Sequence, residues 1–228
     1  MKTVKLALVS LALAAALTGS AVAQQQPAQG QQANQPPPQP MSFFVTSVGK
    51  NDGGNLGGLA GADAHCQSLA QAAGRGNATW RAYLSAGAQG ASGVVHARDR
   101  IGRGPWFNAR GALIASNVDD LHQDRNNIRK PTALNEKGEE VNGVGNQPNM
   151  HDMLTGSDST GRLVPGNVAL TTCNNWTSNS TGNAMLGHHD RLGGPNASWN
   201  AVHSSRSCSQ EDLVATGGAG LFYCFVAN

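Results

Sequence analysis

Four cysteines constrain this 228-residue chain more than any other feature: Cys66, Cys173, Cys208 and Cys224. In an oxidising compartment an even number of cysteines predicts a disulfide framework, here of two bonds. No two of them have CxxC spacing, which argues against a zinc ribbon or a thioredoxin-type motif. Four cysteines can pair in three ways, and their positions in the sequence alone leave all three open.

The N-terminus has the pattern of an export signal. Lys2 and Lys5 precede an apolar run over 6–17, and Ala21-Val22-Ala23 follows as a small-x-small cleavage site. This order is typical of a secretory signal peptide over 1–23, cleaved near Ala23. The apolar run is shorter than the roughly 20 residues that a spanning helix needs, so no membrane span is expected. We therefore predict a secreted or periplasmic protein.

A biased segment follows the predicted signal peptide. Residues 24–40 contain 8 Gln and 5 Pro in 17 positions. Such a segment has almost nothing to bury and cannot offset its ordering entropy, so it is interpreted as a disordered linker. The remaining stretch, 41–228, has the length of one folded domain.

Charge excludes one class of partner. Without Lys2 and Lys5 the chain carries equal numbers of basic and acidic residues. Proteins that bind nucleic acid usually show a basic excess, so no nucleic-acid partner is predicted. The 29 glycines and the low share of charged residues, 13%, favour a loop-rich fold held by disulfides over a helical bundle.

Hydrophobic periodicity predicts a helix near the start of the domain. Apolar residues recur at helical spacing between Ala62 and Ala73, with Cys66 on the inner face. Asp63 is expected in the first turn, where a carboxylate favours the positive end of the helix dipole. Gly74 is the expected stop.

Other segments have the alternating apolar and polar residues, or the continuous apolar residues, that are typical of strands. Residues 79–85 predict a half-buried strand, with Trp80 on the inner face and Tyr83 on the outer one. Further short strands are expected at 43–46, 106–107 and 113–115. Residues 119–130 and 187–195 are expected to be surface loops, and the nearly all-apolar 221–226 a central strand covered on both faces.

Several motifs together resemble one known family, the endostatin (collagen NC10) domain. They are Gly61-Ala62-Asp63-Ala64-His65-Cys66, the strand at 79–85, the turn at 155–162, Cys173-Asn174-Asn175-Trp176-Thr177, Ser207-Cys208 and Phe222-Tyr223-Cys224. The order and spacing of all four cysteines agree with that family. The similarity covers most of 41–228 and is weakest over 87–150.

The resemblance implies an α+β fold, the endostatin-like variant of the C-type lectin-like fold. It implies a mixed, mostly antiparallel sheet with one or two helices. It also implies nested disulfides, Cys66–Cys224 outside and Cys173–Cys208 inside. Secreted or surface bacterial proteins with this pattern are often called lectin-like.

Candidate ligand-binding residues lie inside the predicted inner loop: Trp176, Asn174, Asn175, His188, His189, Asp190 and Trp199. A tryptophan ring could stack on a sugar and the asparagines could hydrogen-bond its hydroxyls, although Trp176, so close to Cys173, also fits a core position. His188 and His189 should point to opposite faces of an extended segment, so one ion could not take both. Completion by His151-Asp152 or His122 would depend on the fold. We therefore predict no metal and no cofactor.

Function is predicted from this layout and from the absence of catalytic motifs. Neither a nucleophile elbow nor a His-Glu-x-x-His motif is present, so no catalytic residue is assigned. The main hypothesis is a non-enzymatic module that binds a glycan or an extracellular matrix or surface protein. The alternative is a structural or protein–protein module of the cell envelope. A third, weaker hypothesis is a metal-dependent hydrolase that uses His188-His189-Asp190. The oligomeric state is left open.

Overall fold

A computed structural model describes residues 39–88, 93–123, 125–194 and 196–227. All of them lie in one compact unit, Pro38–Asn228. The predicted signal peptide, 1–23, and most of the predicted linker lie outside the described residues. Within the part described, no helix combines the length and the apolar character that crossing a membrane requires.

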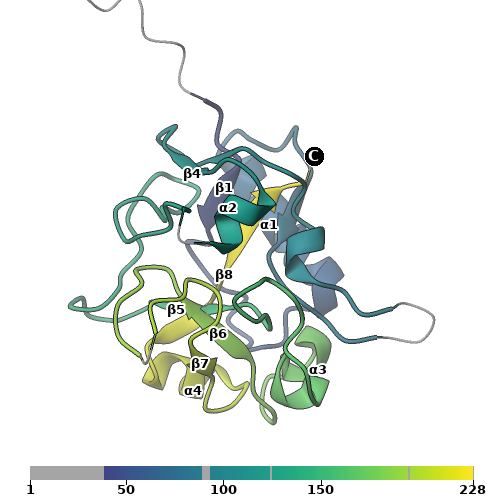
Figure 1. The fold of residues 1–228 in the computed structure, drawn as a ribbon. Coiled ribbons are helices and arrows are strands. Elements are labelled where there is room, and N and C mark those ends of the chain that lie inside the picture. Colours follow the sequence, from purple (N-terminus) through teal and green to yellow (C-terminus); the bar gives the residue numbers. More distant parts are fainter. Residues whose placement is uncertain (1–38, 89–92, 124, 195, 228) are drawn as a thin grey trace, which may run out of the picture. The chain divides into compact units, whose positions relative to one another are not determined.

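The described part is α+β, with one long helix, a mostly antiparallel sheet and short helical turns (Figure 1). The strands are β1 (Phe43–Val45), β2 (Trp80–Ala82), β3 (Trp106–Phe107), β4 (Leu113–Ala115), β5 (Asp152–Leu154), β6 (Met185–His188), β7 (His203–Ser204) and β8 (Gly218–Val226). The helices are α1 (Gly58–Ala72), α2 (Val118–His122), α3 (Cys173–Trp176), α4 (Gln210–Ala215) and the 3-10 turns η1 (Ala97–Asp99) and η2 (Val168–Leu170).

The last strand organises the sheet. β8 pairs antiparallel with β1 and β2 and parallel with β5. Two further antiparallel pairs extend the sheet from β5 through β6 to β7. Figure 1 shows β8, in yellow, reaching from the neighbourhood of β1 to that of β5. The expected central terminal strand is confirmed, as is the mostly antiparallel sheet.

Side chains of β8 alternate between two hydrophobic clusters. Phe222 and Cys224 belong to the cluster that contains residues of α1. Leu221, Tyr223 and Phe225 belong to the other, and all five side chains are buried. Successive residues of a strand point to opposite faces, so a strand covered on both faces must be apolar throughout. This explains the unbroken apolar run at the end of the sequence.

Two disulfides are present and they are nested. Cys66 on α1 is bonded to Cys224 on β8, and Cys173 is bonded to Cys208. No described cysteine is free. The outer bond therefore joins the first helix to the last strand, and the inner bond closes a loop that contains β6 and β7.

The role expected for Asp63 is wrong. α1 begins at Gly58, so Asp63 lies beyond its first turn. Its carboxylate instead accepts hydrogen bonds from Arg81, Arg100 and the backbone N–H of Ala82. Asp63 therefore ties α1 to β2 and to the segment after η1.

The half-buried pattern expected for this strand holds within β2, where Trp80 and Ala82 are buried, but it fails at Tyr83, the next residue. Arg81 is exposed, but Tyr83 is completely buried against the rings of Trp199 and Phe225. The expectation for Tyr83 failed because it assumed that the outer face still meets water at this residue. The second hydrophobic cluster covers that face.

Two predicted surface loops contain regular structure. Within 119–130 the chain forms α2 and buries Leu121 and Ile128 in the second cluster. Within 187–195, residues up to His188 belong to β6. His188, His189 and Asp190, expected on the surface, are buried, with exposed fractions of 1%, 0% and 4%.

Candidate functional site

Three neighbouring strands place one polar residue each on the same face of the sheet. Asp152 of β5 is the register partner of His188 of β6. His203 of β7 is the partner of Leu186, which lies two residues before His188. Residues that oppose each other across strands, or lie two apart on one strand, share a face. Asp152, His188 and His203 therefore converge.

The ligand atoms of these three side chains lie close together. His188 Nε2 is 3.0 Å from Asp152 Oδ1 and 3.1 Å from His203 Nε2. His203 Nε2 is 3.7 Å from the same oxygen. The side chains of Asp152 and His188 are buried, whereas that of His203 is 36% exposed. The group therefore has one side open to solvent.

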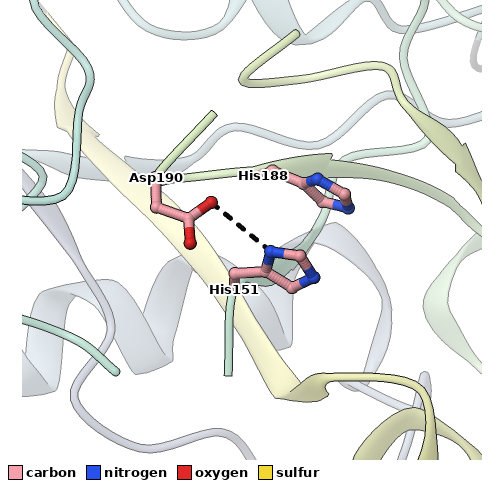
Figure 2. A group of neighbouring side chains, drawn as sticks. All are labelled: His151, His188 and Asp190. Atoms are coloured by element: carbon pink, nitrogen blue, oxygen red, sulfur yellow. Dashed lines mark hydrogen bonds and ion pairs between the residues drawn. The ribbon is translucent and has the colours of Figure 1, made fainter. Parts of the chain in front are cut away.

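A second pair lies against this group. His151 and Asp190 face each other, with His151 Nδ1 donating to Asp190 Oδ1 over 3.4 Å (Figure 2). The backbone N–H groups of Leu192 and Val144 also donate to Asp190, at 3.0 and 2.8 Å. Burial alone would raise the pKa of Asp190, but these hydrogen bonds lower it below its usual value.

Backbone carbonyls fix the tautomers of the two converging histidines. His188 Nδ1 lies 2.8 Å from the carbonyl oxygen of Leu192, and His203 Nδ1 lies 3.1 Å from that of Ser204. A carbonyl can only accept, so each Nδ1 carries the proton. Each Nε2 is then unprotonated in a neutral ring, whereas the 3.1 Å hydrogen bond between the two Nε2 atoms requires a proton on one of them.

Asp152 itself has no hydrogen-bond donor. Neither of its carboxylate oxygens has a hydrogen-bond partner among the described residues. The 3.0 Å approach of His188 is in ion-pair range but is not aligned as a hydrogen bond. Burial would lower the pKa of His188, but the nearby Asp152 carboxylate outweighs it and raises that pKa. Three histidine nitrogens surround Asp152 Oδ1: His188 Nε2 at 3.0 Å, His151 Nε2 at 3.4 Å and His203 Nε2 at 3.7 Å. A positive charge at this position would stabilise the buried carboxylate.

Two glycines pack against the rings of the cluster. A Cβ at Gly194 would come within 3.2 Å of His188 Cε1, and one at Gly217 within 3.3 Å of the His151 ring. Both glycines have positive φ, 77° and 103°, which other residues rarely adopt. The backbone therefore holds the two rings closely on one side.

Two overlapping groups of described residues have the composition and spacing of metal ligands. They are His151, His188 and Asp190, and Asp152, His188 and His203, and within each group the ligand atoms lie within 4.8 Å of one another. His189 belongs to neither group. Its Nε2 faces the carbonyl oxygen of Asn142, and burial lowers its pKa. Adjacent histidines thus point apart, as the extended segment predicted.

The first candidate residues, near Cys173, are structural in this fold. Residues Cys173 to Trp176 all have positive φ and form a left-handed turn. Trp176 is completely buried and its indole N–H donates to the carbonyl of Ser85. Asn175 Oδ1 accepts from the backbone N–H of Gly87, and only Asn174 is exposed. The ring of Trp176 therefore has no face open to a sugar.

Trp199 is also buried, but it lies in the wall of a pocket. Its exposed fraction is 2%, and its indole N–H donates to the carbonyl of Leu121. The pocket has a volume of about 760 Å³. Polar and apolar residues both line it: His122, Gln123, Asp158, Ser159, Val164, Met185, Arg191, Asn196, Ala197, Ser198, Trp199, Asn200 and Ala201.

His122, in the same wall, is held neutral. Its Nδ1 donates to the carbonyl of Val118 and its Nε2 accepts from the hydroxyl of Tyr83. Burial lowers the pKa of His122 from 6.5 to about 4. Neutral His122 is therefore favoured in the folded state.

Acid should destabilise the fold through His122. Neutral His122 contributes its full stabilisation to the fold above pH 6.5. This stabilisation is lost as the pH falls toward 4, because His122 of the unfolded chain binds a proton at a higher pH than His122 of the folded chain. A shift of this size corresponds to about 3 kcal/mol. Between pH 7 and pH 4 the free energy of unfolding, measured with urea, should fall less in His122→Gln than in the unmodified chain, by about 3 kcal/mol. A His122 imidazole that titrates near pH 6.5 in NMR spectra contradicts this expectation.

No family model matches this chain, and no curated protein matches it in sequence. The site is therefore interpreted from its own geometry. The sequence marks His188, His189 and Asp190 as candidates, includes Asp152 only as a completion that depends on the fold, and leaves out His203. No local spacing marks those two, since only strand register brings them to His188.

Proposed function

We propose that this chain is an exported, non-enzymatic binding module with the endostatin-like variant of the C-type lectin-like fold, and that it binds a glycan in the pocket beside Trp199. One observation carries the proposal. Most of the pocket wall belongs to the loop closed by Cys173–Cys208, the loop in which the sequence placed its candidate residues.

The disulfides support both the export and the fold assignment. Structural disulfides persist in oxidising compartments and are rare in the cytosol. Their nesting is the arrangement that the resemblance to the endostatin domain implies. Outer and inner bonds with this spacing, around a mostly antiparallel sheet, fit the proposed fold class.

The pocket has the chemistry that a saccharide requires. Asp158 and Asn196 offer donors and acceptors for hydroxyl groups, while Val164 and Met185 supply apolar surface. Small-molecule sites typically combine such apolar walls with a few placed polar groups, in cavities of about 300–1,000 Å³. A polar ligand with an apolar face is the best match.

A glycan array with matched variants tests the proposal. Gln123 and Ser159 line the pocket and are exposed. The double variant Gln123→Ala/Ser159→Ala should bind a retained glycan at least about 5-fold more weakly, since each lost hydrogen bond contributes about 0.5–1.5 kcal/mol. Gln71→Ala, an exposed change on α1 outside the pocket lining, should bind like the unmodified chain.

Two outcomes contradict the proposal. One is an array that stays silent across neutral and sulfated sugars, which favours the structural or protein–protein module. The other is a retained glycan whose affinity does not change in the double variant, which places the binding site elsewhere. Equal melting temperatures of the three proteins exclude unfolding as the cause of any loss.

A further inference from the structure

We propose that Asp152, His188 and His203 form a binding site for a divalent transition metal of the zinc class, and that His151 and Asp190 support it from outside. This site goes beyond the proposed glycan function. None of the three proposed ligands lines the pocket beside Trp199.

The arrangement of ligand atoms around Asp152 carries the first step. The carbonyls at both Nδ1 atoms leave the Nε2 atoms of His188 and His203 as the nitrogens that could bind a metal, and an ion would replace the proton of their 3.1 Å hydrogen bond. Both lie within 3.7 Å of Asp152 Oδ1, and neither carboxylate oxygen of Asp152 has a hydrogen-bond partner among the described residues. A buried carboxylate and two imidazole lone pairs repel one another unless a cation lies among them. Metal-bound histidines characteristically donate their other ring N–H in this way.

Distances carry the second step. Zinc bonds to histidine nitrogen and carboxylate oxygen are about 2.0–2.2 Å long, so two ligands at a tetrahedral angle lie roughly 3.3–3.6 Å apart. The three separations among the atoms of Asp152, His188 and His203 are 3.0, 3.1 and 3.7 Å. They bracket the spacing of ligands that share one ion.

Geometry also decides between the two candidate groups. Asp190 already accepts hydrogen bonds from His151, Leu192 and Val144. The rings of His151 and His188 are stacked, with centroids 3.9 Å apart and planes at 20°. His151 Nε2 lies 3.4 Å from Asp152 Oδ1, but a ring stacked on that of His188 does not direct its lone pair at the same ion. His151 and Asp190 are therefore positioning residues rather than ligands.

The ligand set specifies the class of metal and leaves one side open. Imidazole with carboxylate suits zinc and its neighbours, whereas calcium and magnesium prefer oxygen ligands. His203 is 36% exposed, which gives an ion a route to the buried Asp152 and His188. Three protein ligands on a tetrahedral ion leave a fourth position for water or an external donor.

Calorimetry with zinc alone tests this site. Purified chain stripped with a chelator should bind one equivalent of Zn²⁺. His203→Gln, a change at the most exposed ligand, should weaken the affinity at least about 100-fold, beyond the 10–100-fold typical of outer residues. Asp152→Asn should do the same. His65→Gln is the matched control, because His65 belongs to neither candidate group.

A positioning variant provides a second readout. Asp190→Asn should lower the affinity about 10–100-fold and still bind one equivalent. The visible absorption of bound Co²⁺ should keep its shape in Asp190→Asn, because the ligands are unchanged, and should change in His203→Gln. Absence of stoichiometric zinc, or equal affinities of His203→Gln and His65→Gln, overturns the site. No glycan enters this experiment, so either result leaves the pocket proposal to its own test.

Discussion

Replacing both Cys66 and Cys224 by alanine should lower the free energy of unfolding by about 5 kcal/mol. The bond joins residues 158 positions apart, and in the chain-entropy model a longer loop restricts the unfolded chain more. Both cysteines are also completely buried, so their loss leaves unfilled space between α1 and β8.

The inner disulfide supplies the matched comparison. Cys173 and Cys208 are 35 positions apart, for which the same model gives about 4 kcal/mol. Urea unfolding of the two double variants should therefore rank the outer pair as the more destabilising. An outer variant as stable as the unmodified chain contradicts the view that this bond closes the domain.

Removing the carboxylate of Asp63 should destabilise the fold by about 3–5 kcal/mol. Arg100 Nη2 lies 2.9 and 2.7 Å from the two oxygens of Asp63, and Arg81 Nη1 lies 2.7 Å from one of them. The side chain of Arg100 is only 11% exposed. Asp63→Ala therefore leaves a buried guanidinium and the N–H of Ala82 without their acceptor.

An exposed ion pair is the control for Asp63. Asp119 contacts Arg98 at 3.2 Å but its side chain is 75% exposed. Asp119→Ala should change the free energy of unfolding by less than about 1 kcal/mol, because water already solvates the Asp119 carboxylate. Urea unfolding that gives similar losses for the two variants contradicts the role assigned to Asp63.

Sequence patterns predicted the elements whose formation depends on neighbouring residues along the chain. The apolar run at 221–226 predicted a strand covered on both faces, and β8 is such a strand. Helical spacing placed Cys66 on the inner face of α1, where it bonds Cys224. The pairing itself came from the family resemblance, since four cysteines alone allow three arrangements.

The candidate metal site could not be predicted in the same way. Asp152, His188 and His203 lie in three different strands, and their approach depends on strand order and register. A shift of one residue in either pairing would turn a ligand to the other face. Polar residues that meet through tertiary pairing leave no periodic signal in the sequence.

Burial of the aromatic residues was equally hard to predict. Tyr83 lies two residues after the polar Arg81 and so on the same face of the strand, which indicates a face exposed to solvent. In the fold that face is covered by the cluster around Trp199 and Phe225. Which layer covers a strand depends on distant segments, so periodicity alone could not show it.

The most direct test of the metal site is an anomalous diffraction map of crystals grown with zinc. The structure leads us to expect one strong peak about 2.0–2.2 Å from a carboxylate oxygen of Asp152 and from Nε2 of His188 and His203. His151 and Asp190 should remain hydrogen-bonded outside it. A map with no peak at these three side chains, or with the peak between His151 and Asp190, contradicts the assignment.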